Sequence, residues 1–112
     1  MLFRSSSGGN SRPFRGEAAK LPGIVKIGRY DEGGQGVAYF DSSKGNTVSK
    51  NWRHDEWVDC TENTVGGVAS CEWIKYTVDV AKAGRYRVKF PYGTPSNCDH
   101  WVDLLQIGRA HV

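Results

Sequence analysis

The sequence predicts an all-β fold, a β-sandwich or jelly roll, and three observations lead to this prediction. Apolar and polar residues alternate along several short segments, as they do on half-buried strands. Turn-forming residues, above all the 14 glycines, separate these segments. No stretch shows the 3.6-residue apolar period of an amphipathic helix. Short strands with turns between them at intervals of roughly ten residues are typical of β-sandwiches.

Length and charge narrow the class of protein. The 112 residues suffice for one domain, and the formal net charge of +3 is small and scattered, which argues against nucleic-acid binding. No apolar run is long enough to span a bilayer, and residues 1–16 lack the apolar centre of a signal peptide. We therefore expect one domain, with neither nucleic acid nor membrane as its partner.

The elements are predicted from the N-terminus onward. Residues 6–15 are rich in Ser, Gly, Asn and Arg and indicate a linker. Strands are then predicted at residues 24–30, 37–40, 52–60 and 101–105, with turns at 31–36 and 91–97 and a polar loop at 41–51. This strand count is low for a closed sandwich, so C-terminal strands are expected to be missing.

The clearest element is an antiparallel hairpin over residues 71–90. In its first half Ile74, Tyr76, Val78 and Val80 alternate with Trp73, Lys75, Thr77 and Asp79. In its second half Tyr86, Val88 and Phe90 alternate with Arg85, Arg87 and Lys89. A period of two places the apolar residues on one face and the polar residues on the other. The segment 81–84 supplies the turn, and a core is expected on the apolar side.

Three cysteines are present, without the spacing of a zinc site. Cys60 ends one strand-like segment and Cys71 begins the next. A disulfide between them would suit an extracellular protein, and two free thiols are the alternative. Cys98 has no evident partner in either case.

The two ends of the chain resemble translated sequencing adapters. Residues 107–112 can be encoded ATC GGA AGA GCA CAC GTC, similar to the start of a short-read adapter. Residues 2–5 can be encoded CTC TTC CGA TCT, similar to the end of the opposite adapter. We therefore expect residues 1–12 to be adapter-like sequence and linker, residues 13–106 to be a partial module, and residues 107–112 to be an adapter-like tail.

An ordered series of short motifs resembles family 6 carbohydrate-binding modules, which have a galactose-binding-like jelly roll. The motifs are Pro13-Phe14, Leu21-Pro22-Gly23, Tyr30-Asp31-x-Gly33-Gly34-x-Gly36-Val37-Ala38-Tyr39-x-Asp41, Gly45-Asn46, Arg53-x-Asp55-Glu56-x-Val58-Asp59, Val65-Gly66, and Glu72-Trp73-Ile74-x-Tyr76-Thr77-Val78-x-Val80-x-x-Ala83-Gly84-x-Tyr86. They cover residues 13–90. The resemblance implies non-catalytic binding of polysaccharide or oligosaccharide by a monomeric module within a larger chain. It also implies that this chain is secreted and extracellular and that the module is attached to a glycoside hydrolase.

The resemblance also implies where sugar would bind. In the family's first cleft an aromatic residue follows Val-Gly, and here that position is Gly67. The aromatic residue of the second cleft matches Trp73, with Glu72, Lys75 and Thr77 around it. Tyr39 is a further candidate. Each of these residues also has an alternative role without sugar. Trp73 could pack under a loop, and Glu72 could pair with Lys75 or an arginine. The Tyr39 hydroxyl could bond the backbone.

No cofactor is expected. The family's calcium site uses acidic or amide side chains in the first strand, but the matching positions hold Lys26, Ile27 and Gly28, which offer no hard oxygen ligands. Catalysis is not expected either. Asp55, Glu56 and Asp59 are carboxylates, but adjacent strand residues point to opposite faces. The alternative function is a galactose-binding-like structural or adhesion domain without a working sugar site, which Gly67 favours.

Overall fold

The computed structural model describes residues 2–4, 11–67, 69, 71–89 and 103–105. Its elements are β1 (Leu2–Arg4), η1 (Phe14–Gly16, a 3-10 helix), β2 (Ala19–Leu21), β3 (Tyr39–Phe40), β4 (Trp73–Val80) and β5 (Asp103–Leu105). The described residues therefore have an all-β fold, as the sequence predicts. Their strands form one small mixed sheet, and long loops connect them.

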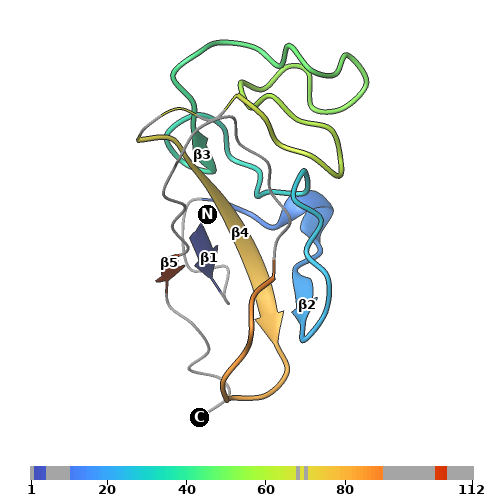
Figure 1. The fold of residues 1–112 in the computed structure, drawn as a ribbon, viewed down its shortest axis with the longest axis vertical. Coiled ribbons are helices and arrows are strands. Elements are labelled where there is room, and N and C mark those ends of the chain that lie inside the picture. Colours follow the sequence, from blue (N-terminus) through green and yellow to red (C-terminus); the bar gives the residue numbers. More distant parts are fainter. Residues whose placement is uncertain (1, 5–10, 68, 70, 90–102, 106–112) are drawn as a thin grey trace.

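The long strand β4 is the centre of this sheet (Figure 1). Strand β2 pairs in parallel with residues 78–80, β1 pairs in parallel with residues 75–77, and β3 pairs antiparallel with residues 73–74. Strand β5 pairs in parallel with β1 at the edge of the sheet. Every partner of β4 thus comes from a segment distant in the sequence.

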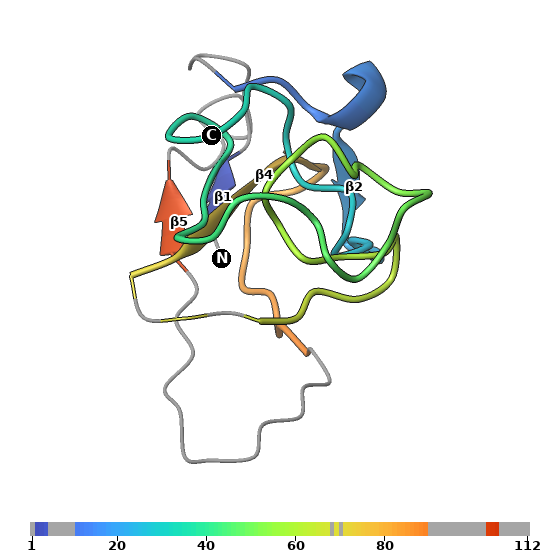
Figure 2. The same ribbon diagram turned by 90° about the horizontal axis from the view of Figure 1, so that it is seen from above.

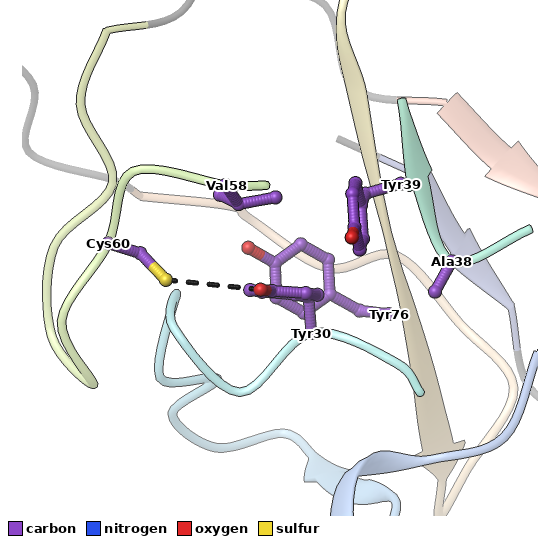
Figure 3. Close-up of a cluster of buried hydrophobic side chains, with 6 residues drawn as sticks. All are labelled: Tyr30, Ala38, Tyr39, Val58, Cys60 and Tyr76. Carbon is purple, nitrogen blue, oxygen red and sulfur yellow. Dashed lines mark hydrogen bonds between the residues drawn. The ribbon is translucent and has the colours of Figure 1, made fainter. Parts of the chain in front are cut away.

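One face of β4, here called the inner face, covers the core. Tyr76, Val78 and Val80 are buried and Ile74 packs against the core, which confirms the predicted alternation. The core cluster contains Tyr30, Ala38, Tyr39, Val58, Cys60 and Tyr76 (Figure 3). In this cluster the rings of Tyr30 and Tyr39 meet edge to face, with centroids 5.7 Å apart.

The segment between β3 and β4 has no regular strand, and side-chain hydrogen bonds hold it together. Away from its two ends, it lies on the opposite side of β4 from β5 in both views (Figures 1 and 2). The Asn46 amide donates to the carbonyls of Trp52 (2.9 Å) and Cys60 (2.8 Å). Its oxygen accepts from the backbone N–H groups of Val48, Ser49 and Cys60. One amide side chain thus satisfies backbone groups that a strand ladder would otherwise pair.

A buried arginine ties this segment to the core. The Arg53 guanidinium is paired with Glu56, donates to the Tyr30 carbonyl, and donates to the Asp31 carbonyl at 2.8 Å. It also lies 3.4 Å from the ring centroid of Tyr30 and 4.8 Å from that of Phe14. The guanidinium therefore has both a carboxylate and carbonyl partners, which a buried charge requires.

The predicted hairpin is only half present. Its first half is β4, but residues 81–89 are exposed and form no strand; Tyr86 is 41% and Val88 56% exposed. Phe90 lies outside the described residues. Local alternation predicted that the two halves pair with each other, whereas β4 pairs with β1, β2 and β3 instead.

Two more predicted strands are wrong. In the segment 24–30 the Arg29 N–H donates to the Lys26 carbonyl at 3.0 Å, which closes a turn, and Ile24 is 88% exposed. In the segment 52–60 Arg53 has φ +45° and its carbonyl accepts from the Glu56 N–H at 3.1 Å. Both segments supply apolar side chains to the core from loops, which residue type alone does not distinguish from strands.

Two shorter predicted strands are confirmed in part. Strand β3 falls within the predicted segment 37–40, and β5 falls within the predicted segment 101–105. Residues 101 and 102 and the predicted turn at 91–97 lie outside the described residues, as do Cys98 and the tail 107–112.

The N-terminal segment is more ordered than a linker. Residues 2–4, predicted to be adapter-like, form β1. The Ser11 hydroxyl is buried and donates to the Asp31 carboxylate at 2.8 Å, while Arg12 and Glu32 exchange two backbone hydrogen bonds of 2.9 and 2.7 Å. The linker prediction is therefore wrong for residues 11–15, and residues 6–10 lie outside the described part.

Candidate functional site

Two aromatic side chains lie side by side on the outer face of β4. Phe40 of β3 is directly opposite Trp73 of β4 in an antiparallel pair. Residues opposite each other in such a pair point to the same face of the sheet. Trp73 is half-buried and does not belong to the core cluster, and Phe40 is 41% exposed. The pair therefore presents aromatic surface to the solvent, as the sequence predicts for Trp73 alone.

Lys75 adds a positive charge on the same face. Its ammonium lies 5.4 Å from the centroid of the Trp73 ring, within the range of a cation–π contact. Both backbone polar groups of Lys75 are hydrogen-bonded. Its N–H donates to the Ala38 carbonyl at 2.9 Å, and its carbonyl accepts from the Asp31 N–H at 2.8 Å. We call Phe40, Trp73 and Lys75 the aromatic platform. A strand backbone positions its members, which favours a fixed geometry.

Among the described residues Glu72 forms no ion pair with Lys75 or an arginine, so that alternative is wrong, while its contact with sugar stays a prediction. One carboxylate oxygen accepts from the N–H and hydroxyl of Ser42, at 2.7 and 2.6 Å. The other accepts from the Ala69 N–H at 2.6 Å. Burial alone would raise the pKa of Glu72, but the hydrogen bonds from Ser42 and Ala69 outweigh it and lower this pKa. The carboxylate joins two loops at the border of the platform.

The neighbouring carboxylate, Asp41, completes this border. It is 6% exposed, and one of its oxygens accepts from the N–H and hydroxyl of Ser43, at 2.9 and 3.0 Å. Burial raises the pKa of Asp41, and the nearby Glu72 carboxylate adds to the increase. The Gln35 side chain bonds both backbone groups of Asp41 at 3.0 Å. The loop after β3 is thus fixed at several points.

Tyr39 is wrongly predicted as a sugar-contacting residue. It is 2% exposed, and its hydroxyl accepts from the Trp57 N–H at 3.1 Å. Burial raises the pKa of this hydroxyl. The backbone bond that the sequence left as the alternative is therefore the one observed. The next residue, Phe40, faces outward instead, because successive strand residues point to opposite faces. Alternation within the segment 37–40 could have identified Phe40.

The positions matching the family's first cleft and calcium site hold little that could bind a ligand. Gly67 has φ +61°, and a Cβ built there would lie 2.9 Å from a carboxylate oxygen of Asp59. Gly28 is packed so closely on the backbone of Thr61 and Glu62 that no side chain fits. Lys26 lies 3.5 Å from Glu62, in an ion pair. The described residues contain no group of three or more His, Cys, Asp or Glu that could hold a metal.

The three carboxylates considered for catalysis have other neighbours. Glu56 is paired with the Arg53 guanidinium. Asp59 accepts from the N–H and hydroxyl of Thr47, at 2.6 and 2.8 Å. The exposed Asp55 lies 3.0 Å from the ring of His54. Each of them thus has a local partner that accounts for its position.

The two described cysteines are not bonded to each other. Cys60 is buried in the core, with its thiol 4.0 Å from the Tyr30 hydroxyl (Figure 3), and burial raises the pKa of the thiol. Cys71 is an exposed thiol next to Glu72. The structure thus has the two free thiols that the sequence left as the alternative to a disulfide.

Comparison with known proteins adds no family. No protein-family model, no curated protein and no solved structure matches this chain. No helix among the described residues is both long and apolar enough to cross a membrane. The functional argument therefore depends on the platform and on the resemblance of the motifs.

Proposed function

We propose that this chain is a non-catalytic carbohydrate-binding module that holds polysaccharide on the aromatic platform. The observation that supports the proposal is the pairing of Trp73 with the exposed Phe40 on the outer face of β4. Aromatic rings cover the apolar C–H face of a sugar, while nearby donors and acceptors bond its hydroxyls. Binding of this kind needs no group with a catalytic pKa.

The motif series from Pro13 to Tyr86 supports the same proposal. It resembles a carbohydrate-binding module with a jelly roll, and we extend the proposal to that fold and to an extracellular module attached to a glycoside hydrolase. The all-β character and the outward-facing Trp73 are compatible with it.

The alternative is a structural or adhesion domain without a sugar site. Gly67 favours it, because this position has neither an aromatic side chain nor room for one beside Asp59 in the present backbone. The two proposals differ in one measurable property, which is retention of the chain by polysaccharide.

Affinity electrophoresis of the full chain through gels containing a panel of neutral and acidic polysaccharides tests the proposal. We expect at least one polymer to retard the chain, and Trp73→Ala to weaken that binding about tenfold, which corresponds to about 1.4 kcal/mol. Tyr86→Ala is the matched control, because Tyr86 is as exposed as Phe40 but lies outside β4. This control should bind like the unchanged chain.

Two results would contradict the proposal. If no polymer retards the unchanged chain, the structural alternative is favoured. If Trp73→Ala and Tyr86→Ala bind equally well, sugar is not held on the platform. Thermal unfolding of each variant shows whether a loss of binding reflects a loss of the fold.

A further inference from the structure

We propose that the aromatic platform selects glycans whose sugars carry a carboxylate, that is, uronic acids, and that Lys75 determines this selectivity. The inference depends on the proposed function and names its ligand class.

The Lys75 ammonium is a positive charge without a carboxylate partner among the described residues. Four ion pairs are present there, and none includes Lys75. Its contact is the Trp73 ring, and the side chain is partly buried. An ammonium has three donors and no acceptor. It can therefore bond a carboxylate while the ring next to it covers a sugar face.

The two nearby carboxylates do not compete for this ammonium. Both oxygens of Glu72 already accept hydrogen bonds from Ser42 and Ala69. Asp41 is 6% exposed, and its carboxylate is bonded to Ser43. Lys75 is therefore the charged group of the platform whose hydrogen-bond donors have no carboxylate partner among the described residues.

The other residues of the outer face leave this charge in place. Thr77, the next residue on that face, is buried and bonded to Asp31. Asp79 is exposed on the same face, but it lies four residues from Lys75, about 13 Å along a strand. At that distance through water its field at the ammonium is largely screened.

The spacing of the platform suits one sugar ring and its acid group. Trp73 and Lys75 are two residues apart on one strand, and thus about 6–7 Å apart along it. The ammonium itself lies 5.4 Å from the centroid of the Trp73 ring, so a pyranose that stacks beside it on the indole can bring its exocyclic carboxylate to the ammonium. Phe40 extends the apolar surface on the other side of Trp73, toward β3.

The experiment compares polymers that differ only in charge. Highly methyl-esterified pectin and its de-esterified form, polygalacturonate, share one backbone; cellulose and its C6-oxidised polyglucuronate form provide a second pair. We expect the unchanged chain to bind the acidic member of at least one pair about tenfold more tightly at low salt, and this preference to shrink as salt rises.

Three variants assign the preference to Lys75. Lys75→Gln should lose more affinity for the acidic polymer than for the neutral one, so that the preference disappears. Lys75→Arg should keep the preference, because it keeps the charge. Lys82→Gln removes the same charge from the exposed turn after β4 and should behave like the unchanged chain.

The contradicting outcomes separate this inference from the proposed function. Equal binding of both members of each pair, or a chain that binds neutral polymers alone, overturns the selectivity and leaves the proposed function standing. If Lys82→Gln reduces the preference for the acidic polymer as much as Lys75→Gln does, the net charge of the chain causes the preference. If Lys75→Gln weakens the binding of the acidic and the neutral polymer equally, Lys75 is a general contact. Either result overturns the role of Lys75 in selectivity. Binding of no polysaccharide at all overturns both proposals.

Discussion

The two faces of β4 come from one stretch of eight residues, yet their surroundings differ. The inner face is apolar throughout, and Tyr76 on it belongs to the core cluster. The outer face has two parts: Trp73 and Lys75 are half-buried at one end, while Thr77 is covered by Asp31 and Ser11 further along. A strand with a period of two can thus stabilise the fold with one face and leave part of the other available for a ligand.

The difference between the two faces of β4 predicts which residues can be substituted without loss of the fold. A core side chain is surrounded by other side chains, so its removal leaves a cavity. A platform side chain borders solvent, so its removal exposes little that was buried. Stability and binding should therefore respond to different substitutions within the same strand.

The largest expected effect comes from truncating the inner face. Tyr76→Ala should lower the free energy of unfolding by about 3–5 kcal/mol, the usual cost of removing a large core ring. Trp73→Ala, three residues earlier on the outer face, should cost about 1 kcal/mol, because its ring is only half-buried. Urea unfolding followed by fluorescence measures both values.

A conservative variant separates the ring from its hydroxyl. The Tyr76 hydroxyl donates to the Ile27 carbonyl at 2.6 Å. Tyr76→Phe should therefore cost about 1 kcal/mol, the net value of one hydrogen bond. If Trp73→Ala costs as much as Tyr76→Ala, the two faces are not divided as described.

Alternation predicted the faces of β4 but not its partners. Residue type along Trp73–Val80 correctly placed Tyr76 inward and Trp73 outward. It did not show that the edges of β4 are covered by β1 and β2, because strand pairing depends on segments far apart in the sequence. The expected neighbour, residues 85–90, alternates in the same way and follows a turn signal at residues 81–84, which are local features of the sequence.

The polar part of the candidate site was harder to predict for the same reason. Glu72 bonds Ser42 across 30 residues, and Asp31 bonds Thr77 across 46. Such contacts leave no pattern in a single sequence. Tyr39 and Phe40 show the opposite case: the alternation was present, and the buried residue was chosen as the candidate instead of the exposed one.

The second-largest expected effect comes from Asp31, whose carboxylate is bonded to the buried Thr77 on the outer face. The buried Asp31 carboxylate accepts from the N–H and hydroxyl of Thr77, both at 2.7 Å, and from the Ser11 hydroxyl at 2.8 Å. Asp31→Asn replaces one acceptor oxygen by a donor that faces other donors. We expect a loss of about 2–3 kcal/mol in unfolding free energy, because buried groups are left unsatisfied.

The N-terminal contact offers a milder control. Ser11→Ala removes one donor and leaves Asp31 with both of its bonds to Thr77. Its cost should be about 1 kcal/mol. Equal costs for Ser11→Ala and Asp31→Asn would show that the residues around Thr77 do not depend on this carboxylate.

The smallest expected effect is at the border of the platform and depends on pH. Glu72→Gln removes the charge from an acceptor of three hydrogen bonds and should cost about 1 kcal/mol near neutral pH. The pKa of Glu72 in the folded protein lies below its ordinary value of 4.5. The stability that the charged form contributes is therefore present above about pH 4.5 and is lost as pH falls through the lowered pKa.

Urea unfolding of the unchanged chain and of Glu72→Gln at neutral pH and at about pH 3 measures this dependence. The difference between the two proteins should shrink at the lower pH, because the charged form of Glu72 contributes less to stability once the pH falls below the ordinary pKa of the group. Asp41 changes in the opposite direction: its pKa is raised by burial, so folding favours its protonated form and acid does not weaken it. A difference that stays constant with pH would mean that the hydrogen bonds of Glu72 do not require its charge, and that shape alone holds the loop beside Trp73.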